Sequence, residues 1–390
     1  MAIHNPHECK PMTLQKKLFI AGIISSTALI IGCQDKSASH EQHAAETSTV
    51  ASSTAISIAT EPALDPSKFL NQPLIRDIYT ADPSAHVFNG KLYIYPSHDI
   101  DSGITTTGEG DKFDMKDYRV FSFDAETAEV TDHGEALNLT DVPWASRQLW
   151  APTAAEKDGK YYLYFPAKDK DGIFKIGIAT SDSPTGPFKA EPEPIEGSFS
   201  VDPAVFKDDD GAHYIYFGGI QGGQLQRWVS GSYVEEDKYP ASNEPALSPK
   251  IARLSDDMLQ FAEPPKDVQI LDGGGVPLLG TDNNRRFFEG AWVHKFNGKY
   301  YLSYSTGDTH YIAYATGDSP YGPFTHKGVV LAPVLGWTTH HSIVQHHGKW
   351  YLFYHDSQLS GGKTYLRNIK VTELLHNDDG SIQTVDAYFE

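Results

Sequence analysis

Hydrophobic positions recur along this chain in five similar units. Each unit opens with an acidic or polar residue and continues with a short apolar run, a glycine turn and a second run rich in tyrosine. The units begin at Asp82, Ala151, Asp202, Glu289 and His341. In the first and fourth units the turn reads Asn-Gly, a strong hairpin signal because both central residues of the favoured turn need a positive φ. Each unit therefore predicts a β-hairpin.

Two of the units continue beyond the hairpin. Residues 176–188 and 311–324 each read as a further strand, a turn rich in proline and glycine, and the start of a fourth strand. The unit starts lie roughly 50 to 90 residues apart, which suits four strands joined by loops of variable length. We predict an all-β fold, a five-bladed β-propeller with four-stranded blades, with extra loops around residues 100–118 and 220–285.

The phase of the repeat brings distant residues together. The first strand of each propeller blade lines the central channel, so residues that head those strands face one another around the axis. Asp82, Asp202, Glu289 and His341 are therefore expected at one funnel. Asp-Pro and Glu-Gly also begin ordinary turns, but a blade needs no buried acid at this phase, and three carboxylates there favour a functional role.

Composition agrees with a folded β-rich protein of one large domain or two smaller ones. Of the 390 residues, 39% are hydrophobic, and 21 Tyr against 4 Met favour short, half-buried strands over helix bundles. The formal charge of −19 disfavours nucleic acid as a partner, because phosphate binding relies on clustered Lys and Arg. A neutral or weakly charged ligand fits better.

The N-terminus has the pattern of an export signal. Lys16 and Lys17 precede an apolar stretch at 18–31, which is too short to span a bilayer comfortably. Because the stretch ends on Gly32 and Cys33, it resembles a bacterial lipoprotein signal, with 1–32 cleaved and the Cys33 thiol acylated; an ordinary signal peptide is the alternative. Gln34 then fits the outer membrane, facing either the periplasm or the surface.

Two further boundaries follow from composition. Residues 33–63 are rich in Ser, Thr, Ala and Glu and contain no aromatic residue, so we expect a flexible tether. Residues 64–390 are expected to form the propeller. The chain has only Cys9 and Cys33, so this body has no disulfide, no thiol nucleophile and no cysteine-based zinc site.

Over about residues 70–385 the chain resembles glycoside hydrolase family 43, five-bladed propeller enzymes that act on xylose- and arabinose-containing glycans. The segments that carry the resemblance are TADPSAHVF at 80–88, LWAP at 149–152, SVDPAVF at 200–206, FEGAW at 288–292 and THHSI at 339–343. Each is weak alone, and together they are specific.

The resemblance implies a role for each acid. Asp82 matches the general base that activates water, Glu289 the general acid, and Asp202 the carboxylate that orients Glu289 and raises its pKa. Glycoside cleavage needs one carboxyl protonated and another ionised at the same pH, and a third negative charge nearby raises one pKa. The family further implies inversion, which needs space for a water between base and sugar.

The resemblance also implies contacts to a metal and to sugar. His341 matches a histidine that touches a calcium ion on the propeller axis, often through water; the alternative is a core histidine held by hydrogen bonds. No cofactor is expected for the chemistry. Trp150 is predicted as the aromatic platform, Arg367 as a cation that reaches substrate, and His98 as a flanking residue, with core packing or a surface ion pair as the alternatives. The remaining histidines of interest, His310, His340, His346 and His347, are expected mostly in turns or at the surface.

We therefore expect an exo-acting, inverting β-1,4-xylosidase on xylan-derived oligosaccharides. An α-L-arabinofuranosidase or an endo-arabinanase is the enzymatic alternative. The alternatives from another class are a glycan-binding propeller without catalysis and a scaffold for protein partners. The three acids argue against the glycan-binding propeller, because a binder has no use for a raised carboxyl pKa. The expected partner is a xylo- or arabino-oligosaccharide, with no nucleic acid and with the membrane reached only through the lipid.

Overall fold

The computed structural model describes residues 64–105, 108–337 and 339–389. The predicted signal peptide, Cys33 and the tether lie outside this part of the chain. None of the helices in it has the length and apolar character needed to cross a membrane. The helices are short 3-10 turns: η1 (Pro66–Lys68), η2 (Gly108–Gly110), η3 (Leu139–Asp141), η4 (Gln221–Gly223) and η5 (Leu225–Arg227).

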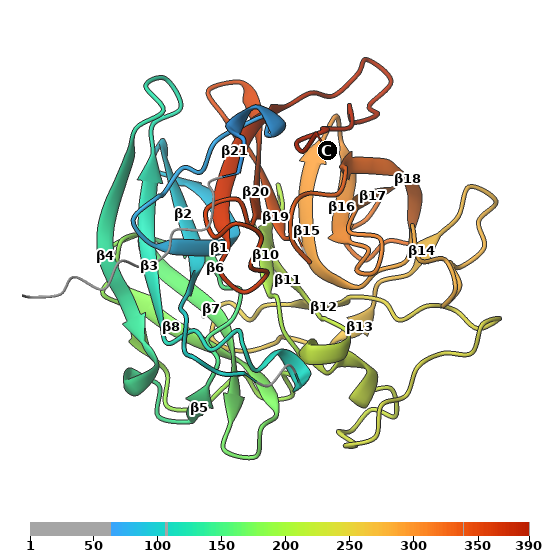
Figure 1. Ribbon diagram of the computed structural model, residues 1–390. Coiled ribbons are helices and arrows are strands. Elements are labelled where there is room, and N and C mark those ends of the chain that lie inside the picture. The colour runs from blue at the N-terminus through green and yellow to red at the C-terminus, as the bar shows by residue number, and fades with distance from the viewer. Residues whose placement is uncertain (1–63, 106–107, 338, 390) are drawn as a thin grey trace, which may run out of the picture. The chain divides into compact units, whose positions relative to one another are not determined.

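Five β-sheets follow one another in chain order around a common centre (Figure 1). The first sheet contains β1 (Tyr79–Phe88), β2 (Lys91–Asp99), β3 (Asp117–Phe123) and β4 (Val130–Asn138). The second contains β5 (Ala145–Arg147), β6 (Thr153–Lys157), β7 (Lys160–Asp169), β8 (Phe174–Ser181) and β9 (Lys189–Ala190). The third contains β10 (Ala204–Lys207), β11 (His213–Phe217), β12 (Lys250–Arg253) and β13 (Lys266–Asp267).

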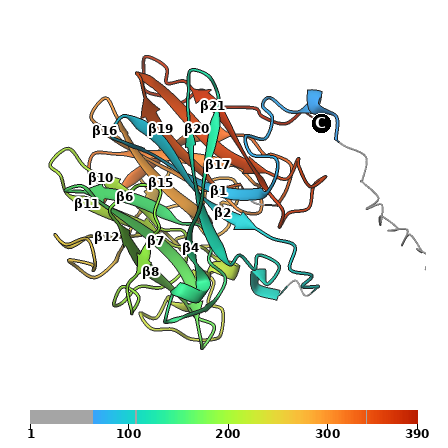
Figure 2. The same cartoon turned by 90° about the vertical axis from the view of Figure 1, so that its left-hand side faces the viewer.

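The last two sheets complete the propeller. The fourth contains β14 (Ile270–Leu271), β15 (Glu289–Phe296), β16 (Lys299–Ser305), β17 (Ile312–Gly317) and β18 (Phe324–Leu331). The fifth contains β19 (His341–His346), β20 (Lys349–Asp356) and β21 (Asn368–Leu374). The fifth sheet lies beside the first in both views (Figures 1 and 2), where Thr80 N donates to Arg367 O at 2.9 Å and Ala85 N to Ser342 Oγ at 3.0 Å.

The five-bladed propeller is confirmed, but four strands in every blade was too uniform a prediction. The fourth sheet gains β14, which pairs in parallel with β18, and the second gains β5, which pairs with β7 beside β6. The fifth sheet has three strands among the described residues. The two additional strands, β5 and β14, come from connections between units, which lie outside the repeated pattern.

Buried tyrosines explain the Tyr-rich second run of each unit. In each of the five units, the second strand of the hairpin contains a tyrosine that is at most 1% exposed. The hydroxyl of this tyrosine donates to a group in a neighbouring loop. The pairs are Tyr95 with Pro184 O, Tyr164 with Met258 O, Tyr216 with Pro320 O, Tyr304 with Arg285 O and Tyr354 with Asn71 Oδ1. Each ring fills the core while its hydroxyl finds a partner, as a buried tyrosine requires.

The long loop of the first unit lies where the sequence predicts it, but the loop predicted at 220–285 was too long, because β12, β13 and β14 lie within that range. Residues 100–116 connect β2 to β3, and residues 218–249 connect β11 to β12. Both loops contribute to the pocket described below.

Candidate active site

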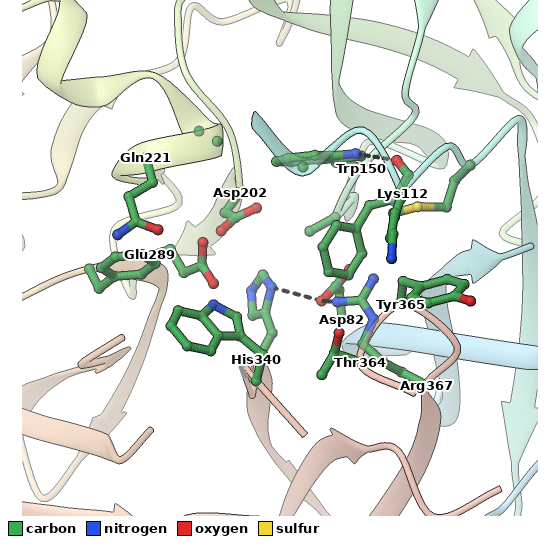
Figure 3. Close-up of a pocket in the computed structure, with 18 of the residues that line it drawn as sticks. Asp82, Lys112, Trp150, Asp202, Gln221, Glu289, His340, Thr364, Tyr365 and Arg367 are labelled. Carbon is green, nitrogen blue, oxygen red and sulfur yellow. Dashed lines mark hydrogen bonds and ion pairs between the residues drawn. The ribbon is translucent and has the colours of Figure 1, made fainter. Parts of the chain in front are cut away.

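Asp82, Asp202 and Glu289 lie in one pocket of about 760 Å³, from three different blades (Figure 3). The pocket lies near the beginning of the innermost strands: Asp82 is in β1, Asp202 comes just before β10, and Glu289 opens β15. Its other lining residues are Gly110, Lys112, Phe113, Met115, Trp150, Ala151, Ile220, Gln221, Gly222, Gly223, Phe288, Trp337, His340, Gly362, Lys363, Thr364, Tyr365 and Arg367. The repeat phase therefore placed the three acids correctly.

Local backbone irregularities turn these carboxylates toward the pocket. Asp82 has a φ of +48° and lies where the β1–β2 register shifts, and Asp202 has a φ of +57° just before β10. Glu289 opens β15 at a similar register shift. Bulges re-aim side chains out of the regular alternation, and a left-handed residue other than glycine costs about 1 to 3 kcal/mol. Strain of this kind gathers at functional sites.

Gly290 shows why Glu289 is followed by glycine. It has a φ of +65°, and a Cβ at this position would lie 3.0 Å from the His340 ring. Its amide donates to Asp202 Oδ2 at 3.1 Å. The glycine therefore leaves room for the His340 ring, while its amide ties Asp202 to the residue that follows Glu289.

Asp82 is held in its ionised form. Arg367 Nη1 donates to its Oδ1 at 2.8 Å, Ser97 Oγ donates to its Oδ2 at 2.7 Å, and His340 Nδ1 lies 3.5 Å from Oδ1. Burial raises the pKa of Asp82, but the Arg367 charge and the histidine contacts outweigh burial and hold this pKa well below 3.8. A carboxylate ionised in this way can accept a proton from water.

Glu289 is held in its protonated form. Burial, and then the negative charge of Asp202, raise the pKa of Glu289 from 4.5 to about 8. Burial also raises the pKa of Asp202, to about 6, assisted by the charge of Asp82 and opposed by that of His340. The pocket thus contains one acid that stays charged and one that keeps its proton at neutral pH, which is the division of roles that acid–base hydrolysis needs.

Asp99 positions Arg367. Its Oδ2 accepts from Arg367 Nε and from the Arg367 main-chain amide, and its Oδ1 accepts from Nη2, each at 2.8 Å. Both residues are buried, and the guanidinium also lies 5.0 Å from the Phe113 ring centre. With Nε and Nη2 held by Asp99, Nη1 is directed at Asp82.

Replacing Asp99 by alanine should therefore cost both stability and activity. Arg367 would keep Asp82 as a carboxylate partner but lose its three hydrogen bonds to Asp99. Because removing one partner of a buried ion pair is strongly destabilising, we expect the free energy of unfolding to fall by about 3 to 5 kcal/mol. Urea unfolding of the purified variant measures this loss. Asp99→Asn keeps one acceptor oxygen and should lose less, and Asp101→Ala on the exposed loop should change little. A loss below about 1 kcal/mol for Asp99→Ala, the range of exposed pairs, would contradict this account.

Trp150 and Arg367 lie where the sequence predicts them, in the pocket wall (Figure 3). Trp150 Nε1 donates to Phe113 O at 2.7 Å. The edge of its ring passes so close to Gly110 that a Cβ there would lie 2.6 Å away. The indole is therefore fixed by the loop between β2 and β3.

His98 does not flank the pocket, so that prediction was wrong. Ser97 reaches Asp82 and Asp99 reaches Arg367, and successive side chains of a strand point to opposite faces. His98 lies between them on β2 and therefore points away, where its Nδ1 contacts Asp117 Oδ1 at 2.8 Å.

His340 was expected in a turn or at the surface, and this too was wrong. It lines the pocket beside Asp82, and Gly290 is packed against its ring. Burial lowers the pKa of His340, but the neighbouring acids outweigh burial and raise it above its ordinary value. Of the other three histidines, His347 and His310 occupy turns with φ of +48° and +57°, as expected, whereas His346 is buried.

His341 lies in the channel and does not line the pocket. It is fully buried, its Nε2 is 2.6 Å from Ser303 Oγ, and its Nδ1 has no hydrogen-bond partner in the described part of the chain. That free nitrogen fits a role as a single metal ligand. No group of three or more His, Cys, Asp or Glu side chains among the described residues could hold a metal, so waters or carbonyls would supply the other ligands that calcium prefers.

Several lining residues were missed because they come from loops. Lys112, Gln221, Trp337, Thr364 and Tyr365 lie in connections that differ from unit to unit. The repeat therefore carried no signal for them, although Trp337 is conspicuous as a 43% exposed indole at the pocket.

Comparison with known proteins gives consistent relatives. The family model of glycosyl hydrolases family 43 matches residues 73–382. The chain is 60% identical over 321 residues to xylosidase/arabinosidase 43A of Humicola insolens, covering 80% of this chain and 98% of that protein. It is 53% identical over 309 residues to a β-xylosidase of Xylanibacter ruminicola, covering 79% and 97%.

Solved structures of related enzymes have the same fold as this chain. CoXyl43, a GH43 β-xylosidase/α-arabinofuranosidase from a compost metagenome solved with xylotriose in a calcium-free form, has a TM-score of 0.81 and 67% identity, over 82% of this chain and 98% of that one. A GH43_1 enzyme of Xanthomonas citri complexed with xylotriose has a TM-score of 0.80 and 58% identity, over 83% and 96%.

Proposed function

We propose that this chain, which belongs to glycosyl hydrolases family 43, is an exo-acting, inverting β-1,4-xylosidase. In this proposal it removes xylose from xylan-derived oligosaccharides. The observation that carries the proposal is the opposed ionisation of Asp82 and Glu289 within one pocket. The substrate class rests on relatives named as xylosidases and on relatives solved with xylotriose.

Each acid takes one part in the reaction. Asp82 removes a proton from a water that attacks the anomeric carbon, and the bond between that carbon and the glycosidic oxygen breaks. Glu289 gives its proton to the departing oxygen, so the aglycone leaves as an alcohol. Burial, together with the negative charge of Asp202, keeps Glu289 protonated until then, and Arg367 holds Asp82 in place and ionised. Direct attack by water inverts the anomeric configuration.

The pH dependence of kcat/KM follows from these pKa values. Asp82 is already ionised at pH 4, because its pKa lies well below 3.8, so the base limits activity only in strong acid. Glu289 must keep its proton, so activity should fall by about tenfold per pH unit above a midpoint near pH 8. Initial rates on xylobiose between pH 5 and 10 measure this decline. Activity that still rises beyond pH 9 would contradict Glu289 as the acid.

The substrate test uses three compounds with the purified protein: xylobiose, p-nitrophenyl β-D-xylopyranoside and p-nitrophenyl α-L-arabinofuranoside. We expect turnover of both xylosides, with α-xylose as the first product detected by NMR of the anomeric proton. β-Xylose as the first product would refute inversion. Binding of xylotriose without turnover of any compound would favour the glycan-binding alternative.

Arabinofuranosidase activity is the second candidate, because relatives carry both activities in their names. The arabinofuranoside in the same assay decides it. A kcat/KM for the arabinofuranoside above that for the xyloside would make it the principal activity.

Two properties remain proposals beside the chemistry. A structural calcium ion on the axis, touched by the Nδ1 of His341, is supported by the lack of a hydrogen-bond partner for that buried atom among the described residues. Export, cleavage before Cys33, acylation of Cys33 and residence at a bacterial outer membrane are supported by the sequence of 16–34. Mass spectrometry of the protein from membranes, with Cys33→Ser beside it, tests the lipid.

A further inference from the structure

Lys112 and Tyr365 form the side of the pocket that lies opposite Glu289 (Figure 3). Lys112 comes from the loop between β2 and β3, and Tyr365 from the loop between β20 and β21. The Lys112 ammonium lies 5.3 Å from the centre of the Tyr365 ring. We call this pair the Lys112–Tyr365 wall.

We propose that the Lys112–Tyr365 wall closes the pocket beyond the sugar being released and that the Lys112 ammonium donates to the O4 hydroxyl of this terminal xylose. The wall then restricts the enzyme to the non-reducing ends of chains. This inference rests on the proposed function and names the residues that would determine its exo action.

The direction of the substrate follows from the chemistry of the acid. Glu289 must reach the glycosidic oxygen, so the aglycone lies on the side of Glu289. In Figure 3, Glu289 and Gln221 lie on one side, Lys112 and Tyr365 on the other, and Asp82 and Asp202 between them. The C4 atom of a pyranose is across the ring from C1. With C1 between base and acid, O4 therefore points toward the Lys112–Tyr365 wall.

Lys112 is suited to bind a hydroxyl. Its side chain is partly buried and forms no ion pair with any described residue. Its ammonium lies over the Tyr365 ring. An ammonium held over an aromatic face is stabilised by the ring, yet its three N–H groups still need acceptors. The other cation of the pocket wall, Arg367, donates to Asp99 through Nε and Nη2 and to Asp82 through Nη1. A sugar oxygen next to Lys112 would meet a cation that is paired with no carboxylate of the described residues.

The wall is held in place by its neighbours. Phe113 O accepts from Trp150 Nε1 at 2.7 Å, and Gly110 O accepts from Gln148 Nε2 at 3.0 Å, so the main chain on both sides of Lys112 is tied to the second unit. On the other loop, Leu366 N donates to Lys363 O at 3.0 Å around Tyr365. Groups fixed in this way can exclude a further sugar as well as contact one.

The hydroxyl contact is tested with Lys112→Met, which removes the charge and keeps the length of the side chain. We expect kcat/KM for p-nitrophenyl β-D-xylopyranoside to fall about 10-fold or more, as for loss of a charged hydrogen bond. The matched control is Lys170→Met, at an exposed lysine that does not line the pocket. On the 4-deoxy analogue of the substrate, Lys112→Met should cost less than twofold, because the partner hydroxyl is already missing. Equal losses on both substrates, or no loss on either, would overturn the contact.

The closing role is tested with the double variant Lys112→Ala/Tyr365→Ala and xylohexaose. The wild type should release xylose one residue at a time, and the variant should also produce xylobiose and xylotriose at early times. Release of xylose alone by an active variant would show that other residues close the pocket.

Failure of the proposed function gives a different result. If the wild type cleaves none of these compounds, the xylosidase assignment fails by itself. The Lys112 contact is then decided by calorimetry with free xylose, for which Lys112→Met should weaken binding about 10-fold and Lys170→Met should not. Unchanged affinity would overturn it.

Discussion

Replacing Glu289 by glutamine is expected to lower kcat for xylobiose by about 10³-fold to 10⁴-fold, at the upper end of what one proton-transferring group contributes. The second xylose unit of xylobiose would leave as an alkoxide unless the glycosidic oxygen is protonated, and glutamine has no proton to give at the right acidity. The amide has nearly the size of the carboxylic acid, so the pocket should keep its form. Steady-state rates on xylobiose measure the loss, and thermal unfolding shows that the variant is folded.

An activated leaving group separates the role of the acid from any other damage. 2,4-Dinitrophenolate needs little protonation, so the Glu289→Gln variant should hydrolyse the 2,4-dinitrophenyl xyloside within about 10² of the wild type. The decline of activity above pH 8 should also disappear, because the group that titrates there is gone. An equal loss on both substrates would show that Glu289 acts in some way other than as a general acid.

Replacing Asp82 by asparagine is expected to lower kcat by about 10³-fold to 10⁴-fold on xylobiose and on the dinitrophenyl xyloside alike. Both reactions need an activated water, so a better leaving group cannot compensate for a missing base. Asparagine preserves the shape of the side chain and tolerates the left-handed backbone that Asp82 adopts at φ +48°. The contrast with Glu289→Gln is therefore in the dependence on the leaving group.

Asp158→Asn is the matched control for this substitution. Asp158 is exposed, has a φ of +55° and lies in a hairpin turn away from the pocket, so the same chemical change there should leave kcat unchanged. Asp82→Asn also leaves Arg367 without its second carboxylate, which should show as a lower unfolding temperature. Retention of more than a tenth of the wild-type rate by folded Asp82→Asn would exclude Asp82 as the base.

The two acids depend on opposite surroundings within one pocket. Asp82 meets Arg367, Ser97 and His340, whereas Glu289 meets another carboxylate, Asp202. Burial raises the pKa of both acids, and the neighbouring charges decide the outcome for each. Desolvation strengthens these charge effects. Arg367 donates to both Asp99 and Asp82. Removal of Asp99 should therefore also disturb Asp82, because Arg367 would no longer be held in position beside it.

The five-bladed architecture and the convergence of the three acids could be predicted from the order of residues alone. Hairpin turns such as Asn89-Gly90 are local signals, and a repeated unit places equivalent positions at equivalent points around the axis. Once the repeat was recognised, the convergence of Asp82, Asp202 and Glu289 followed without any knowledge of tertiary contacts. The resemblance to a known family added Trp150 and Arg367, which lie in the pocket wall.

The surroundings of these acids depend on contacts between distant parts of the chain and could not be predicted from the sequence. His340, Asp99 and Lys112 act through contacts that span blades or loops, and the loops differ from one unit to the next. Strand alternation, visible once β2 is paired, turns Ser97 and Asp99 inward and His98 away. The pKa of each carboxyl depends on burial and on charges brought near from distant parts of the chain, and the order of residues in one strand does not contain that information.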